Sequence, residues 1–448
     1  MLPAYTFLQS IANKKGLFWI LFFLPCAFVT AYILYVPTNV IFCDEWRFVP
    51  MIESMHNHQL SWQDIWAPLN EHRFVLIKLL FLLSALFFQM NTKVLMLLSV
   101  VCLTLTSLML YRYFTIHIPN KYAAFLYLPV HYLLLSIRQW ENFTMGIQLV
   151  DFAMILFLVA SLLVMDKALQ KNKISLFLFS ICLASLSSLF WGIGIFTFLL
   201  LIAQFECYRL PTLKKTWYTR IVLYAATLFA AYAFIYLSKQ ETRIMFILTH
   251  IPEAAMYCMI NIGNTLIGEF ANKPILWVHL LFGFVLATLY IRVLWIYFRG
   301  KADVKKNIPM VAILFIFFSL VMSFLLTYSR AHFGLIQAAT SRYATLTMLG
   351  GAGLYMAVAN LWTCNKKYKL LYIMVLMLII LGVGISTLEE SRMMVSRKAY
   401  YNNLVSVLQL PSEERTDDKL QPFNVSVEHV RKGIPILKRY RLSTYSQP

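Results

Sequence analysis

The segment that decides the fold is IFCDEWRFVPMIESMHNHQLSWQDIWAPLNEHR, residues 41–73. It carries five of the 20 acidic residues in the chain, and it directly follows a long apolar run. Charged groups this close to hydrocarbon are costly in free energy, so their presence indicates a function. We therefore expect residues 41–73 to form a polar loop at a membrane surface. The loop would carry functional side chains, and lipid-facing helices would hold it in place.

The composition is typical of a membrane protein. Apolar residues make up 60% of the chain and charged residues 13%, whereas soluble domains average about 45–50% and about 25%. The mean hydropathy of +0.68 agrees with this. Since a spanning helix needs about 20 residues, a chain of 448 residues is long enough for ten or more spans. We predict an all-α, polytopic membrane protein.

The net charge of +19 has a simple explanation in such a protein. Lys and Arg gather in short clusters between the apolar runs, as expected for cytoplasmic loops. Lys14 and Lys15 precede the first run and predict a cytoplasmic N-terminus. We therefore expect the lipid bilayer, and no nucleic acid, to be the partner of this positive charge.

The charge pattern also decides the number of spans. The apolar run 74–90 is at the lower length limit for crossing, and every later basic cluster falls on the inner side only if it does not cross. We predict a surface helix for 74–90 and about 11 transmembrane helices in all. The expected spans are 16–36, 94–111, 122–137, 149–165, 174–190, 192–207, 221–237, 275–298, 309–328, 344–362 and 370–387.

This topology predicts the organisation of the chain. Residues 1–387 would form the membrane domain, with an outer loop and surface helix at 37–93. Residues 388–448 are too polar to insert and would form a small tail on the periplasmic side, with a surface helix and an irregular basic end.

Unusual polar residues fall in four segments that this topology places outside. Each residue alone also fits a simpler role, such as a helix cap for Glu71 or interfacial anchoring for the arginines and tryptophans. Asp151, at the start of a span, should face the interior of the bundle. The candidate catalytic residues are Asp44, Glu45, Glu71 and Glu141, and the candidate substrate-binding residues are Trp46, His72, Arg73, Trp140, Asn142, Gln148, Arg330, Arg342 and Tyr343.

Taken together, these residue types suit one kind of chemistry. A carboxylate can accept the proton of an acceptor hydroxyl, and arginines can bind a phosphate and stabilise the charge that builds on it. The tryptophans can stack on sugar rings. The sequence has no P-loop, GxGxxG or HExxH motif, and His56 and His58 are poorly spaced for a metal. We expect no cofactor and no metal.

In the order and placement of its motifs, the chain resembles the GT-C superfamily of integral-membrane glycosyltransferases. The segments that carry the resemblance are CDEW at 43–46, NEHR at 70–73, WENFTMGIQ at 140–148 and SRYAT at 341–345. More narrowly, it is similar to bacterial glucosyltransferases that modify O-antigen or other surface glycans. WEN stands where a DxD-like motif might be expected, which argues against a metal.

The resemblance implies an enzyme of the hexosyltransferase type in the cell inner membrane. Its donor would be a polyprenyl-phosphate sugar and its acceptor a glycan or lipid on the extracytoplasmic face. Asp44 would be the general base, Glu71 and Glu141 the further acids, and the arginines would hold the donor phosphate. A flippase and a donor-synthesising enzyme are the partners that the resemblance implies.

Two alternatives stay open. A transporter or flippase would carry charges near mid-span and a symmetry between the two halves, whereas the charges here favour one face. A ligase that moves a whole glycan from a lipid diphosphate would depend on the arginines more than on Asp44.

Overall fold

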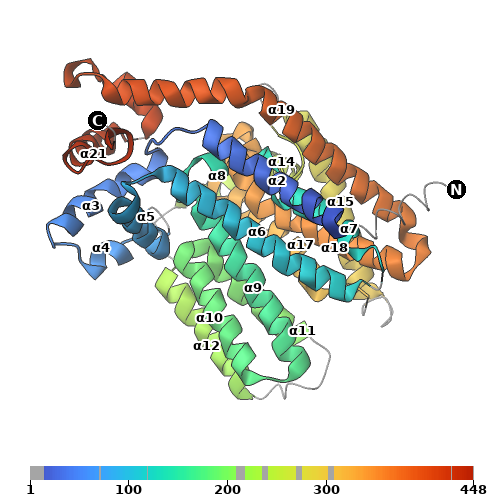
Figure 1. Ribbon diagram of the computed structural model, residues 1–448. Helices are drawn as coiled ribbons and strands as arrows, with labels where there is room; N and C mark the ends of the chain where they lie inside the picture. The colour runs from blue at the N-terminus through green and yellow to red at the C-terminus, as the bar shows by residue number, and fades with distance from the viewer. Residues whose placement is uncertain are drawn as a thin grey trace.

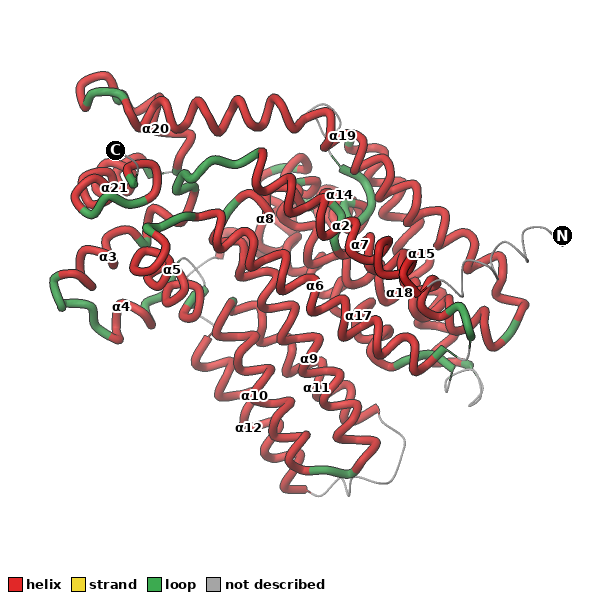
Figure 2. Tube along the Cα trace, in the orientation of Figure 1, coloured by secondary structure: helices red, strands yellow, loops and turns green. Residues whose placement is uncertain are grey.

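The computed structural model describes residues 15–69, 72–118, 120–207, 217–234, 241–268, 275–300, 307–424 and 426–446. Within these ranges the chain is helical, and the only bridge is an isolated antiparallel one between Leu69 and His72. Figure 2 shows helices joined by short loops. The all-α prediction is confirmed for the part of the chain that the structure describes.

A bundle of long helices forms the body of the molecule (Figure 1). Small residues allow close approach inside it: a Cβ on Gly283 of α15 would lie 1.8 Å from the Met259 carbonyl oxygen of α14. The helices are α2 (Lys15–Tyr35), α6 (Thr92–His117), α7 (Ala123–Leu134), α9 (Leu149–Lys171), α10 (Ile174–Phe190), α11 (Phe196–Cys207), α12 (Trp217–Phe234), α13 (Glu241–Thr249), α14 (Ile251–Gly263), α15 (Leu276–Arg299), α17 (Met310–Arg330), α18 (Ala344–Cys364) and α19 (Lys369–Gln409).

Each of the eleven expected spans overlaps one of these helices, but not all are long enough to cross a membrane on their own. Seven candidates in the described residues are long and apolar enough: Lys15–Tyr35, Thr92–His117, Gly146–Lys171, Leu276–Arg299, Met310–Phe333, Ser341–Cys364 and Lys366–Gln409. The other four expected spans fall on α7, α10, α11 and α12. Length and composition therefore support seven candidate membrane spans in the described residues, as expected for a multi-span membrane protein, and the expected count of about eleven is not confirmed.

The first loop folds into a small lobe at one end of the bundle (Figure 1). It consists of η1 (Cys43–Arg47), α3 (Val49–His56), α4 (Trp62–Trp66) and α5 (Val75–Phe88). The 14 residues of α5 rise about 21 Å, less than the ~30 Å of a hydrocarbon core. Buried Lys78 on α5 donates to the carbonyl oxygens of Asp64, Ile65 and Ala67 at 2.9, 3.1 and 2.7 Å. These hydrogen bonds satisfy the free carbonyl groups at the C-terminal end of α4 and join α4 to α5.

The C-terminal segment packs on this lobe. α19 runs unbroken for 41 residues across the expected boundary at 387/388, and the chain then returns through α20 (Asp417–Leu420) and α21 (Val427–Arg439). α21 contacts α3 and η1. The tail residues Leu420, Phe423 and Leu437 share one buried hydrophobic cluster with Trp46 of the first loop. The expected irregular end of the tail is helical instead, because α21 is amphipathic and has a loop surface to cover.

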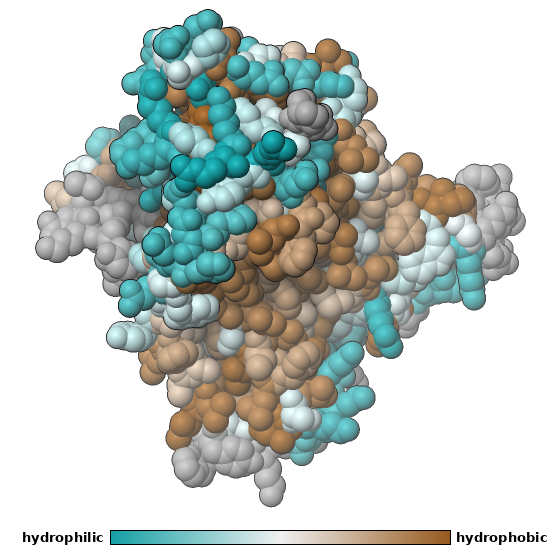
Figure 3. Space-filling model, turned by 60° about the vertical axis from the view of Figure 1, so that its left-hand side comes forward, coloured by the Kyte–Doolittle hydropathy of each residue, from teal (hydrophilic) through white to brown (hydrophobic). Residues whose placement is uncertain are grey.

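The surface pattern separates the two parts. Figure 3 shows hydrophilic residues gathered over the end that carries the lobe and the tail, above an apolar body. Large exposed apolar side chains such as Trp277, Phe284 and Ile291 lie along the helices of the body. Exposed apolar faces of this size mark contact with a membrane or partner, and the lobe covers one end of the apolar body.

Candidate active site

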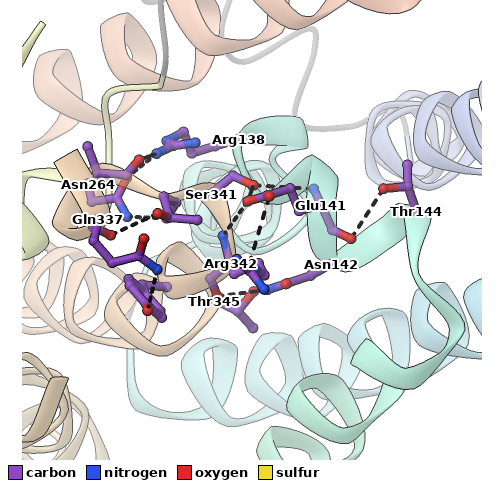
Figure 4. A network of polar contacts seen from close by, with 12 residues as sticks. Arg138, Glu141, Asn142, Thr144, Asn264, Gln337, Ser341, Arg342 and Thr345 are labelled. Atoms are coloured by element: carbon purple, nitrogen blue, oxygen red, sulfur yellow. Dashed lines mark hydrogen bonds and ion pairs between the residues drawn. The ribbon is translucent and has the colours of Figure 1, made fainter. Parts of the chain in front are cut away.

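A carboxylate and a guanidinium from distant parts of the chain meet at the lobe end of the bundle (Figure 4). Glu141 lies on the short helix α8 (Trp140–Thr144), and Arg342 on the turn η7 (Ser341–Tyr343) that precedes α18. Glu141 Oε2 accepts from Ser341 Oγ at 2.6 Å and from the Arg342 backbone N–H at 3.2 Å. Glu141 Oε1 lies 3.8 Å from Arg342 Nε. Glu141 thus fixes both the backbone and the side chain of the turn.

Asn142 makes a second connection between the same two segments. Its Nδ2 donates to the Arg342 carbonyl oxygen at 2.9 Å and to Thr345 Oγ1 at 2.7 Å. Thr345 Oγ1 in turn donates to Gln139 Oε1. Asn142 and Thr345 are buried, and Asn142 holds the Arg342 backbone in place; the substrate-binding role of Asn142 stays a prediction.

Buried Arg138 holds the loop that connects α17 to α18 (Figure 4). Its Nε donates to the Ile267 carbonyl oxygen at 2.7 Å, and its Nη2 donates to the Ala339 carbonyl oxygen at 2.8 Å and to Asn264 Oδ1. Asn264 Nδ2 reaches the Thr340 carbonyl oxygen at 2.8 Å. These hydrogen bonds hold the backbone of the loop at Ala339 and Thr340, just before Arg342.

The Arg342 side chain is 39% exposed, although its Nε is buried. No hydrogen bond in the described residues occupies its terminal nitrogens. Besides Glu141, it interacts electrostatically with Asp44 and Cys43 of the first loop and with Asp151 at the start of α9. Asp151 is buried in the bundle, as predicted. Arg342 is thus the positive centre of a group of three carboxylates.

Asp44 is the first-loop carboxylate of this group. It lies in η1, is half-buried, and its carboxylate has no hydrogen-bond partner within the described ranges. The preceding residue, Cys43, has a φ of 51°, a left-handed conformation that costs a residue with a side chain. Asn424 Nδ2 of the tail donates to the Cys43 carbonyl oxygen. The tail thus supports the strained turn that presents Asp44.

Glu45 has a different position from its neighbour. It is completely buried, and its two oxygens accept from the backbone N–H groups of Phe42 and Ile147 at 2.9 and 2.8 Å. Burial raises the pKa of its carboxyl to about 7, while these backbone hydrogen bonds act in the opposite direction. Glu45 joins the first loop to the start of α9, and no substrate atom can reach it. The predicted catalytic role of Glu45 is not supported.

The two candidate tryptophans are also held by the C-terminal segment. Trp46 is fully buried, and its ring lies against Gly433 and Phe423, so it has no face left for a sugar. Trp140 is stacked under the guanidinium of Arg397, whose carbon lies 3.3 Å from the ring centroid. Arg397 pairs at 2.7 Å with Glu390, and both are buried on α19.

Sequence reasoning missed Glu390 and Arg397. Both residues fall in the expected surface helix of the tail, and their spacing of seven residues places them on one face of that helix. That spacing was the available signal.

The remaining candidates lie around this centre or on other surfaces. The Arg73 side chain donates to the Trp66 carbonyl oxygen at 2.6 Å, and the His72 ring packs edge-on against Trp191. Arg330 interacts electrostatically with Tyr257, which also contacts Tyr343. Gln148 is half-buried at the start of α9. Glu71, which was predicted as a further acid, lies outside the described residues.

A search of the described residues finds no group of three or more His, Cys, Asp or Glu side chains arranged to hold a metal ion. Comparison of the chain with protein-family models, curated proteins and solved structures finds no match.

Proposed function

We propose that this protein transfers a sugar from a polyprenyl-phosphate donor to a glycan or lipid acceptor at the outer face of a membrane. The observation that carries the proposal is that Arg342 pairs with Glu141 at 3.8 Å and also interacts electrostatically with Asp44 of the first loop, at the polar end of an apolar helical body. The resemblance to GT-C glycosyltransferases supports the same assignment. The bacterial inner membrane is the location that it favours.

Asp44 is the general base in this proposal. It takes the proton of the acceptor hydroxyl as the acceptor oxygen forms a bond to the anomeric carbon of the donor sugar. The bond between the anomeric carbon and the phosphate oxygen breaks, and the polyprenyl phosphate leaves with the electron pair. A half-buried carboxylate without a hydrogen-bond partner in the described residues suits this role, since its oxygens are available to the acceptor.

Arg342 binds the leaving phosphate. Its side chain is 39% exposed, and a guanidinium can match two phosphate oxygens at once and stabilise the negative charge that grows as the bond breaks. Glu141 is a positioning residue, because its carboxylate is occupied by Ser341 and the Arg342 backbone. The electrostatic interaction of Arg342 with both Asp44 and Glu141 supports a role for the base and the phosphate-binding group at one reacting centre.

The experiment is a transfer assay in membrane vesicles that carry the protein, with a radiolabelled polyprenyl-phosphate hexose as donor. Asp44→Asn should reduce transfer at least about 100-fold, the lower range for loss of a general base, and Arg342→Ala should raise the KM for the donor. Glu413→Gln removes an exposed carboxylate of the tail and serves as the charge-matched control. Full activity of Asp44→Asn together with loss in Arg342→Ala would remove Asp44 as the base and leave the phosphate-binding role of Arg342. Full activity of both variants would refute the proposal.

A further inference from the structure

A groove opens beside the proposed reacting centre, between the end of α19 and the turn that carries α20. Its volume is about 440 Å³, within the range of small-ligand sites. Leu404 and Val407 provide apolar surface, and Tyr400, Asn403, Ser406 and Asp418 are among the polar groups that line it. The function described above leaves this groove without a role.

The groove lies close to the first loop at Tyr400. The ring of Tyr400 meets the ring of Phe42 edge-on, with centroids 6.4 Å apart, and Phe42 is two residues before Asp44 along the chain. On the next residue of α19, the Tyr401 backbone carbonyl oxygen accepts from Thr38 Oγ1 at 3.3 Å. The end of α19 is thus fixed against the first loop, and one end of the groove lies next to the segment that presents the proposed base.

The side chains that line the groove have the chemistry that sugars require. An amide, a hydroxyl and a carboxylate offer both donors and acceptors to sugar hydroxyls, and a partly exposed tyrosine ring offers a face for the C–H side of a sugar ring. The single charges of Asp418 and Lys419 balance each other, which disfavours a phosphate or another anion. Lys419 Nζ already donates a hydrogen bond to the Glu414 carbonyl oxygen at 3.0 Å.

We propose that this groove is the acceptor subsite and binds a neutral saccharide whose reactive hydroxyl extends toward Asp44. The inference rests on the proposed sugar transfer and adds the chemical class of the acceptor. The polyprenyl-phosphate donor would approach Arg342 from the membrane, and the acceptor glycan would approach from the aqueous side along α19.

The test uses the full chain in nanodiscs, with the polysaccharide released from the host envelope by mild acid as the acceptor probe. The variant Asn403→Ala/Asp418→Asn should raise the KM for this acceptor about tenfold or more, with the KM for the donor and kcat at saturating acceptor unchanged. Asn402→Ala, which removes an exposed amide of α19 outside the groove, is the matched control.

The outcomes separate the two proposals. Active wild-type protein with an unchanged acceptor KM in the groove variant, or an equal change in Asn402→Ala, overturns the acceptor subsite and leaves the transfer proposal intact. If wild-type protein transfers nothing, direct binding of the polysaccharide, measured by saturation-transfer NMR, decides. If wild-type protein binds the polysaccharide and the groove variant does not, the groove remains a saccharide site. If wild-type protein does not bind the polysaccharide, or if both proteins bind it equally, the groove proposal is refuted.

Discussion

At the scale of single residues, Asp44 and Glu45 show how adjacent carboxylates acquire different roles. Asp44 remains half-buried near Arg342, whereas the Glu45 oxygens are taken up by the N–H groups of Phe42 and Ile147. A Cβ on Gly146 would lie only 2.8 Å from Glu45 Oε1. Glu45 therefore lies in a close-fitting backbone socket, and its contribution is to stability.

This burial predicts a specific pH dependence. The folded pKa of Glu45 is about 7, above its ordinary value of 4.5, so the folded state keeps a proton that the unfolded chain loses as the pH rises between these values. The resulting stabilisation is complete at low pH and is lost as the pH rises to about 7, a change on the order of 3 kcal/mol. Glu45→Gln has no such dependence.

The measurement is thermal unfolding of both proteins in detergent, followed by tryptophan fluorescence from pH 5 to pH 8. At pH 5, Glu45→Gln should be less stable by about 1–3 kcal/mol, since its amide leaves one backbone N–H without an acceptor. This difference should shrink toward pH 8. A difference that stays constant or grows with pH would contradict the assigned burial.

The sequence predicted part of this site for a clear reason. Asp44, Glu141 and Arg342 each follow or precede an apolar run, so a topology argument alone placed them on one face. The burial of Glu45 and Trp46 could not be predicted from the sequence, because the groups that enclose them come from Ile147 and Gly433, far along the chain. No local pattern reports such a contact.

At the scale of elements, the main difference from expectation is α19. The boundary at 387/388 was placed where hydropathy falls, yet the helix continues to Gln409. Residues 369–409 contain no proline, and nothing after Gly384 interrupts helix formation. A fall in hydropathy reports the loss of lipid contact, and it does not report the end of a helix. The same helix then carries Glu390, Arg397 and Tyr401 into the site.

Docking of α21 on the first loop depends on Gly433. A Cβ at this position would lie 2.7 Å from Trp46 Cε3, so Gly433→Val should push α21 off η1 and destabilise the protein by about 1–3 kcal/mol. Limited proteolysis in detergent should then cleave the tail faster than in wild type. Lys432→Val, at an exposed neighbour, is the control. Equal cleavage of the two variants would show that the tail does not dock through Trp46.

At the scale of the whole molecule, the proposal requires that the lobe and tail lie on one side of a membrane. The 41 residues of α19 extend about 60 Å, long enough to cross the hydrocarbon and continue into the aqueous phase. Exposed Lys367 lies just before this helix and exposed Ser412 just after it. The two positions should therefore be on opposite sides.

Cysteine labelling tests this arrangement in a background without the seven native cysteines. In intact cells, Ser412→Cys should react with a membrane-impermeant maleimide, whereas Lys367→Cys should react only after permeabilisation, because the basic cluster before α19 is expected inside. Labelling of both positions in intact cells would mean that α19 does not cross. The reversed pattern would place the proposed site on the cytoplasmic side.

The most direct test of the central claim compares the surface glycans and lipids of cells that carry wild-type protein, Asp44→Asn or no copy of the gene, by mass spectrometry. We predict an added hexose on one glycan or lipid species with the wild-type protein only, and equal amounts of both proteins in the membrane. The same products in all three strains, or the added hexose with Asp44→Asn at the wild-type level, would contradict transfer by a base at Asp44.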